Sequence, residues 1–243
     1  MLREEDKEKV RKLNEDILKA RHIVFFGGAG VSTESGIPDF RSAHGIYTDN
    51  LSAEEIVSHD FFFADPPGFY DFYKSKMVFL NARPNACHLK LAEIERLGKD
   101  VTVITQNIDG LHQKAGSAKV IELHGSVHRN HCLKCGAFYT AEEIMAQKGV
   151  PYCPKCGGLI KPDVVLYGEE LDINAISKAL SALEEADLLI VGGTSLKVYP
   201  AASFIDYYKG EKKYFINLND NPLHGYTYLN EKIGEVFSAL TLK

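Results

Sequence analysis

The stretch HIVFFGGAG, residues 22–30, decides the fold of this chain. Four consecutive apolar residues, IVFF at 23–26, are typical of a buried β-strand, and the glycines after them predict a tight turn. Short β-rich runs of the same kind recur at residues 101–105, 120–123, 164–167, 188–191 and 214–218. Strands that are apolar on both faces favour a parallel sheet covered by helices on both sides.

Helical patterns lie between several of these runs. Apolar residues recur at helical spacing within residues 10–18, 89–97 and 176–183. Strands that alternate with helices are typical of the α/β class. The predicted fold is therefore a Rossmann-like parallel sheet with helices on both faces, plus a smaller zinc-ribbon and helical domain.

Two long stretches interrupt the alternation, and they define the expected domains. The first, residues 38–84, is rich in polar and aromatic residues and contains several prolines. The second, residues 126–161, holds four of the five cysteines. Both are too long for plain connections between elements. We expect one catalytic unit over residues 1–243, in which residues 1–37, 85–125 and 162–243 form the large domain and residues 38–84 (helical) and 126–161 (zinc ribbon) form the small domain.

Composition bounds the class of protein. The chain has 243 residues, 45% hydrophobic and 25% charged, with a net charge of -5. An acidic balance argues against nucleic-acid binding, so no sequence-specific nucleic-acid partner is expected. The first twenty residues lack the apolar core of a secretory signal, and no apolar run approaches the roughly 20 residues needed to span a bilayer. The expectation is a cytoplasmic enzyme with no membrane partner.

Four cysteines are spaced as metal ligands. They are Cys132, Cys135, Cys153 and Cys156, two CxxC pairs separated by 17 residues. This spacing lies within the zinc-ribbon range, and two such pairs complete a tetrahedron around one ion. Gly136 and Gly157 follow the pairs, where a turn with positive φ suits glycine. Four thiolates leave no open position, so the pattern predicts one structural zinc ion per chain.

The glycine turn after the first strand is a partial dinucleotide fingerprint. Gly28 and Gly30 fit its first positions, but Thr33 takes the place of the third glycine. No second strand with an acidic residue follows about 20 residues later, as the full fingerprint requires. Small residues let backbone N–H groups approach a phosphate, and the hydroxyl of Ser32 or Thr33 can add a donor.

Polar residues follow the ends of several predicted strands. They include TQNID at 105–109, LHG at 123–125, GGTS at 192–195, and Asn217. The carboxyl ends of parallel strands meet at one edge of a sheet, where open α/β folds bind ligands. The sequence therefore predicts a ligand site along this edge.

Six motifs give the chain a resemblance to a known family. They are GAGVSTESGIPDFR (28–41), TQNIDGLH (105–112), HG (124–125), the paired CxxC, KPDVVLYGE (161–169) and GTSLKVYP (193–200). In this order they resemble the sirtuins, NAD-dependent protein-lysine deacylases, of the bacterial type. The resemblance spans about residues 22–220.

The resemblance implies a reaction with NAD as co-substrate and an acylated-lysine protein or peptide as partner. The acyl oxygen attacks the nicotinamide ribose, nicotinamide leaves, and an alkylimidate forms. His124 then acts as general base through the ribose hydroxyls, and water adds to complete the release of O-acyl-ADP-ribose and free lysine. Asn107 and Asp109 position the ribose and the carboxamide, and Phe40 keeps water away from the cleaved face.

The resemblance also assigns contacts. His124 and Asn107 are the expected catalytic residues. The expected NAD contacts are Gly28, Ala29, Gly30, Thr33, Phe40, Arg41, Gln106, Asn107, Ile108, Asp109, His124, Gly193, Thr194, Ser195, Asn217 and Leu218. An extended peptide is expected to add as a strand against Val164, Val165, Tyr167, Gly168, Glu169, Leu196, Val198 and Tyr199.

The chain departs from relatives at two places. Gly27 stands where many relatives have threonine. Members that remove succinyl or malonyl groups carry a Tyr-x-x-Arg pair, whereas Tyr73 is followed here by Lys76. Lysine offers a point charge instead of a bidentate fork, which favours acetyl or another neutral acyl group. Desuccinylase or longer-chain deacylase activity stays open as an alternative.

Two other function classes compete. An NAD-dependent ADP-ribosyltransferase could use the same site, but it has less need of a base such as His124. A non-enzymatic zinc-ribbon module would bind nucleic acid or protein through a basic, aromatic ribbon. Residues 126–161 are only mildly basic, and such a module leaves residues 106–109 unexplained.

Overall fold

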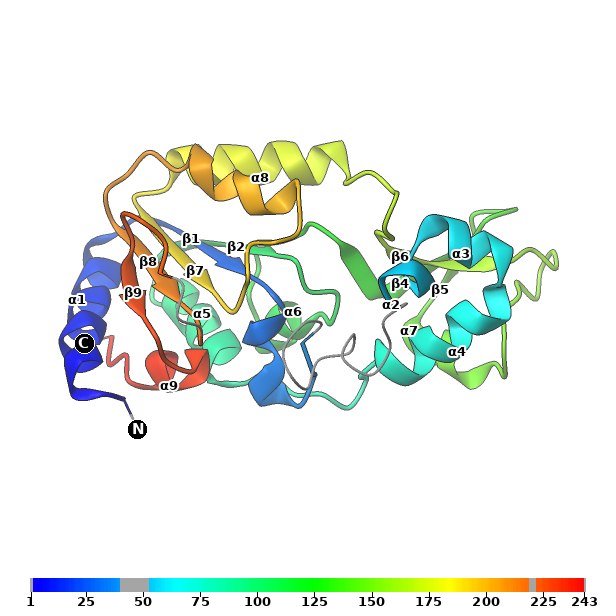
Figure 1. The fold of residues 1–243 in the computed structure, drawn as a ribbon, viewed down its shortest axis with the longest axis horizontal. Coiled ribbons are helices and arrows are strands. Elements are labelled where there is room, and N and C mark those ends of the chain that lie inside the picture. Colours follow the sequence, from blue (N-terminus) through cyan, green and yellow to red (C-terminus); the bar gives the residue numbers. More distant parts are fainter. Residues whose placement is uncertain (1, 40–52, 219–221, 243) are drawn as a thin grey trace.

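A computed structural model describes residues 2–39, 53–218 and 222–242, arranged as two lobes side by side (Figure 1). Six parallel strands of the described residues form the sheet of the larger lobe. They are β1 (His22–Gly27), β2 (Asp100–Thr105), β3 (Val120–Glu122), β7 (Leu188–Gly192), β8 (Lys213–Ile216) and β9 (Thr227–Leu229). Their order in the sheet is β3-β2-β1-β7-β8-β9, the arrangement of dinucleotide-binding folds. The predicted Rossmann-like sheet is confirmed.

Helices cover both faces of this sheet, as predicted. Ile23 and Phe25 of β1 join a core cluster beneath α1 (Glu4–Lys19), α5 (Ala86–Arg96) and α9 (Ile233–Ser238). Val24 and Phe26 join the opposite cluster, beneath α8 (Ile173–Glu185) and the 3-10 helix η3 (Ala201–Tyr207). Successive strand residues point to opposite faces, so a continuous apolar run has both faces to bury.

Polar side chains fix where two covering helices begin. Asn85 caps α5 by accepting from the Cys87 N–H, and Asp172 caps α8 by accepting from the Asn174 N–H. The amide of Asn85 also donates to the Val31 carbonyl at 2.7 Å. This cap therefore ties α5 to the glycine turn after β1, which includes the short 3-10 helices η1 (Ala29–Val31) and η2 (Thr33–Ser35).

The smaller lobe combines the two inserted stretches. The first supplies α2 (Ala53–Ile56), α3 (His59–Ala64) and α4 (Pro66–Lys76), and the second supplies nearly all of β4 (Gly125–Cys132), β5 (Phe138–Tyr139), α7 (Ala141–Ala146) and the start of β6 (Ile160–Val164). The antiparallel order is β5-β4-β6. Phe62, Phe69 and Tyr73 share one buried cluster with Cys132 and Cys153, so the two stretches pack on each other.

The expectation of a sheet strand at residues 164–167 is wrong. β6 (Ile160–Val164) ends where the predicted strand begins, and it pairs antiparallel with β4 in the smaller lobe. Beyond it, Tyr167 makes one isolated bridge to Ser58. The run VVLY is apolar because Val164 and Leu166 pack into the core of the smaller lobe, not because both faces lie in a sheet. The short edge strand β9 was not predicted.

No helix among the described residues has both the length and the apolar character needed to cross a membrane.

Two histidines are buried side by side beneath the sheet. His88 of α5 and His112 of α6 (Leu111–Ala115) have ring centroids 4.6 Å apart, and the Nε2 atom of each finds no hydrogen-bond partner within the described part of the chain. Burial lowers the pKa of His88 to about 4. Burial, together with His88, also lowers the pKa of His112 well below its ordinary value. Both imidazoles are therefore neutral in the folded protein at neutral pH.

We predict that this pair makes the fold acid-sensitive. An unfolded histidine has a pKa near 6.5, so the unfolded chain binds protons that folded His88 excludes. Stability present above pH 6.5 is thus lost as the pH falls towards 4, by on the order of 3 kcal/mol for His88 alone. Thermal melts of wild type, His88→Gln and the exposed control His224→Gln should show the flattest pH dependence for His88→Gln. An equally steep loss in all three would contradict the prediction.

Candidate active site

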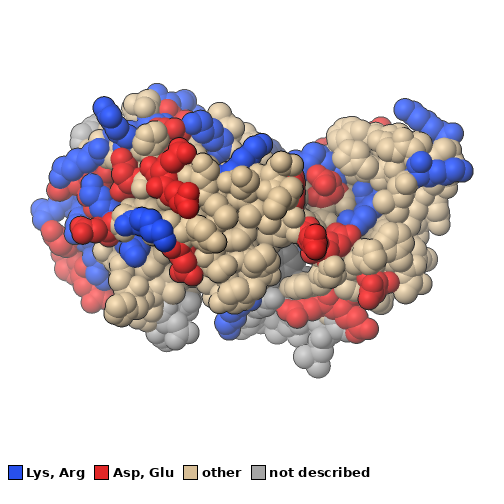
Figure 2. Space-filling view, turned by 90° about the horizontal axis from the view of Figure 1, so that it is seen from above, with Lys and Arg blue, Asp and Glu red and all other residues tan. Residues whose placement is uncertain are grey.

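A cavity of about 900 Å³ opens at the carboxyl ends of the parallel strands. The turn after β1, residues 106–108 after β2 and the segment 193–200 after β7 line it from the larger lobe. Val57 and Met77 line it from the smaller lobe. Figure 2 shows the surface hollowed between the two lobes. The cavity occupies the edge where parallel α/β sheets bind their ligands.

Two glycine-rich turns pack directly on one another at this edge. The N–H of Gly28 donates to the Gly192 carbonyl at 3.2 Å, and that of Gly30 donates to the Gly193 carbonyl at 2.8 Å. A Cβ on Gly30 would lie 2.9 Å from the Cα of Gly193. Glycine is thus needed here because the two turns lie too close together to leave room for a side chain. The Gly28 and Gly30 N–H groups that sequence reasoning offered to a phosphate already have partners.

Thr194 is the centre of a polar group beside these turns. Its hydroxyl accepts from the Gln106 amide at 3.2 Å and from the Leu196 N–H at 3.1 Å. Its carbonyl accepts from the Asn217 amide at 3.0 Å. Residues that follow β2, β7 and β8 are thereby held together, as the strand-end pattern predicted.

A second network lies deeper. The Ser32 hydroxyl donates to the Asp109 carboxylate at 2.6 Å and accepts from the Asn107 amide at 3.1 Å. Burial raises the pKa of the Asp109 carboxyl, and the hydrogen bonds from Ser32 and the Leu111 N–H oppose that shift. Asp109 does not line the cavity, whereas Asn107 does. The hydrogen bonds of this network therefore fix the orientation of the Asn107 side chain from the side away from the cavity.

His124 follows β3 and lines the same cavity. Its Nδ1 lies 3.0 Å from the Gln106 carbonyl oxygen. A carbonyl only accepts, so Nδ1 carries the hydrogen and Nε2 keeps a free lone pair. Burial lowers the pKa of His124, and the bond to Gln106 opposes the shift only in part. His124 is therefore neutral at neutral pH and able to take a proton.

Most of the residues expected at the site line the cavity. From the NAD set these are Gly28, Ala29, Gly30, Gln106, Asn107, Ile108, His124, Gly193, Thr194, Ser195, Asn217 and Leu218. From the peptide set they are Val164, Val165, Tyr167, Gly168, Glu169, Leu196, Val198 and Tyr199. Thr33 is exposed and does not line it. Phe40 and Arg41 lie outside the described residues.

Sequence reasoning missed several lining residues. They are Asp39, Val57, Met77, Leu166, Glu170, Leu171, Ile173, Ile176, Lys197, Pro200, Phe215 and Leu223. Asp39 follows Pro38 inside a recognised motif, and Lys197 lies within another, so their neighbours carried a signal. Val57 and Met77 reach the cavity only through the packing of the inserted helices, which no local pattern reveals.

The four cysteines predicted as ligands come together in the smaller lobe. Their sulfurs all lie within 4.8 Å of one another, with Cys132 to Cys156 at 3.5 Å and Cys135 to Cys153 at 3.7 Å. Tetrahedral zinc with Zn–S bonds of about 2.3 Å requires sulfurs about 3.8 Å apart. Gly136 and Gly157 both have φ of 70°, as predicted. The donor set and its spacing fit one zinc ion.

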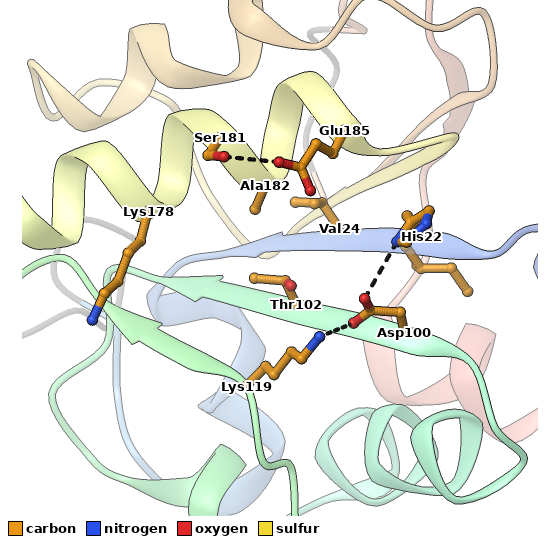
Figure 3. A pocket seen from close by; sticks show the side chains of 10 residues that line it. His22, Val24, Asp100, Thr102, Lys119, Lys178, Ser181, Ala182 and Glu185 are labelled. Atoms are coloured by element: carbon orange, nitrogen blue, oxygen red, sulfur yellow. Dashed lines mark hydrogen bonds and ion pairs between the residues drawn. The ribbon is translucent and has the colours of Figure 1, made fainter.

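A smaller cavity of about 230 Å³ lies at the opposite edge of the sheet. Figure 3 shows Asp100 joined to both Lys119 and His22, and Ser181 joined to Glu185, while Lys178 lies apart from them. Asp100 bonds Lys119 at 2.5 Å and His22 at 3.3 Å, and Ser181 donates to Glu185 at 3.0 Å. These contacts lie at the amino ends of the strands, away from His124.

Residues 28–200 match the family model described as "Sir2 family". This chain belongs to the Sir2 family. A Sir2 relative from Clostridium perfringens is 52% identical over 96% of this chain and 98% of its own length, and one from Clostridium acetobutylicum is 53% identical over 86% and 88%. Both are named NAD-dependent protein deacetylase.

Solved Sir2 structures share the fold. A Sir2 complex with deacetylated p53 peptide and 3'-O-acetyl-ADP-ribose superposes with a TM-score of 0.86 at 38% identity, covering 95% of this chain and 96% of that one. A structure of Sir2 bound to acetylated peptide gives a TM-score of 0.82 at 37% identity, covering 94% and 95%. The resemblance seen in the sequence motifs is confirmed.

Proposed function

We propose that this chain is an NAD-dependent protein-lysine deacetylase. It transfers the acetyl group of an acetyl-lysine side chain to ADP-ribose, and releases nicotinamide, O-acetyl-ADP-ribose and the free lysine. The observation that carries the proposal is the neutral His124, whose Nε2 lone pair is free in a cavity that Asn107 also lines. The names of the Sir2 relatives support it.

NAD is the proposed co-substrate, held along the carboxyl ends of the strands. The dinucleotide is proposed to contact the predicted set that lines the cavity, with Thr194, Gln106 and Asn217 presenting a connected polar wall to it. Asn107, fixed by Ser32, orients the nicotinamide ribose. His124 takes the proton of a ribose hydroxyl, and the Gln106 carbonyl stabilises the proton on its Nδ1. Thr33, Phe40, Arg41 and Asp109 stay proposed contacts.

The substrate is proposed to bind as an extended peptide between two segments of the cavity wall. These are residues 164–169 of the smaller lobe and residues 196–199 of the larger lobe, all of which line the cavity. Main-chain hydrogen bonds would give most of the affinity, with little preference for side chains. Such binding would let the enzyme accept acetyl-lysine in more than one protein.

The proposed organisation is a large Rossmann-like domain and a small domain built around one structural zinc ion. Four thiolates close the metal's coordination, so zinc contributes folding energy and takes no part in the chemistry. We also propose a cytoplasmic location, where free thiols stay reduced. Five cysteines without a disulfide suit that compartment. Cell fractionation with an antibody to the chain tests it.

The decisive assay is NAD-dependent nicotinamide release by purified protein. Acetyl-lysine peptide plus NAD should yield nicotinamide, O-acetyl-ADP-ribose and deacetylated peptide in equal amounts. Unmodified peptide serves as the control, because an ADP-ribosyltransferase would modify a protein acceptor without removing any acyl group. Nicotinamide release with no loss of acetyl groups would overturn the proposal.

We predict a strong preference for neutral acyl groups. Lys197 is the one Lys or Arg among the described lining residues, whose carboxylates are those of Asp39, Glu170 and Glu169, the last of them paired with Lys161. A succinyl carboxylate would therefore lie near other carboxylates, and no arginine among the described lining residues could bind it with two hydrogen bonds. Acetyl peptide should be turned over at least about tenfold faster than succinyl peptide, since one unpaired buried charge costs several kcal/mol.

Lys76, which stands where the arginine of the Tyr-x-x-Arg pair is expected, has an exposed side chain and does not line the cavity. Lys76→Arg should leave both rates unchanged. A native preference for succinyl peptide would show that a cation outside the described lining residues reaches the acyl group.

A further inference from the structure

Lys161 forms an unusual contact inside the smaller lobe. It lies in β6, and its ammonium donates to the Val164 carbonyl at 3.1 Å and to the Glu169 carboxylate at 3.0 Å. Only 16% of the Lys161 side chain and 21% of that of Glu169 are exposed. The ammonium therefore joins the first and last residues of the segment 164–169.

The same carboxylate also closes the turn within this segment. Glu169 Oε2 accepts from the Leu166 N–H at 2.9 Å, and the Glu169 N–H donates back to the Leu166 carbonyl at 2.9 Å. Gly168 takes a φ of 88° between them, a conformation that suits glycine. The Lys161–Glu169 ion pair and the hydrogen bonds between Glu169 and Leu166 together hold the backbone of residues 164–169 in one conformation.

Backbone hydrogen bonds connect the segment 164–169 to His124 and to Val57. The Val165 N–H donates to the His124 carbonyl at 3.0 Å, and the Tyr167 N–H donates to the Val57 carbonyl at 3.0 Å. All six of its residues line the cavity. Its position therefore shapes one wall of the cavity and supports the backbone of His124.

We propose that Lys161 is a positioning residue for the acyl-lysine peptide, acting through Glu169 and the Val164 carbonyl without touching the substrate. This rests on the proposed deacetylase function. Removing the ammonium would leave Glu169 as a mostly buried carboxylate without its cation, and the segment would give up the shape that presents the peptide wall. The NAD side, built on the turns of β1 and β7, would be left intact.

The test compares Lys161→Met with Lys148→Met, the same change at an exposed lysine of the same lobe. Lys161→Met should raise the KM for acetyl-lysine peptide about tenfold, the effect of losing one charged hydrogen-bond pair. Its KM for NAD should stay within about twofold of wild type. Calorimetry of peptide binding without NAD should show the same loss of affinity, independent of turnover. Lys161→Arg, which keeps the charge, should recover most of it.

Other results would overturn the proposal. An unchanged peptide KM in Lys161→Met, or an equal rise in the KM for NAD, would show a merely structural role. Should Lys161→Met fail to fold, Glu169→Gln decides instead, because its amide oxygen still accepts from Leu166 while the charge pair is lost. A wild-type peptide KM in Glu169→Gln with a native melting temperature rejects the proposal. Wild-type protein that binds the peptide but never deacetylates it would refute the proposed function instead.

Discussion

Replacing His124 with alanine should reduce deacetylation by about 10²–10⁴-fold, the usual cost of losing a general base. The fold should persist, because His124 belongs to none of the buried apolar clusters. Cleavage of nicotinamide precedes the base-dependent step in the implied reaction, so exchange of labelled nicotinamide should outlast deacetylation in the variant. Deacetylated peptide and nicotinamide exchange are measured in the same preparation.

The pH profile adds a second readout. Burial lowers the pKa of His124, so its base form persists below pH 6.5. The rate at pH 6.5 should therefore exceed half of its alkaline plateau, and the acid limb should fall below that pH. His59→Ala, which alters an exposed histidine with no place in the cavity wall, should leave the profile unchanged.

Wild-type turnover by folded His124→Ala would contradict the assignment of the base. His112, at the end of the TQNIDGLH motif, is the next histidine to consider for that role. The structure buries His112 against Phe25 and His88, outside the cavity lining. The base would therefore have to be sought elsewhere in the wall.

The fold and most of the site follow from local sequence because parallel strands bring their carboxyl ends together. Once HIVFFG is recognised as the central strand, the polar residues after each strand must meet at one edge. Gln106, Thr194 and Asn217, far apart in the chain, form one hydrogen-bonded group for this reason.

The remaining features depend on packing that no local pattern specifies. Val57 and Met77 reach the cavity because the helices around them pack on the cysteine module. The apolar run at 164–167 resembles a sheet strand, but it lines the cavity instead. The partners of Gly28 and Gly30 lie at the end of β7 and in the turn after it, so their packing role could be seen only in three dimensions.

Replacing Cys132 with alanine should remove the metal and unfold much of the smaller lobe. Wild-type protein should hold about one zinc ion per chain by elemental analysis, as four clustered thiolates require. Structural zinc binding in small modules contributes on the order of 10 kcal/mol of folding free energy, comparable to the stability of a whole domain. Cys132 and Cys153 also lie in the buried cluster with Phe62 and Tyr73, so metal and apolar packing stabilise the same core.

The effect of Cys132→Ala should extend to catalysis through one strand. β4 (Gly125–Cys132) carries the metal ligand at one end, and its other end directly follows His124. Cys87→Ala is the matched control, since it removes a buried thiol from the core of the larger lobe, far from the cysteine cluster in the fold. That control should keep its zinc and lose only modest stability, whereas Cys132→Ala should lose zinc, cooperative melting and deacetylation together. A zinc-free Cys132→Ala protein with native melting temperature and activity would show that the lobe folds without its metal.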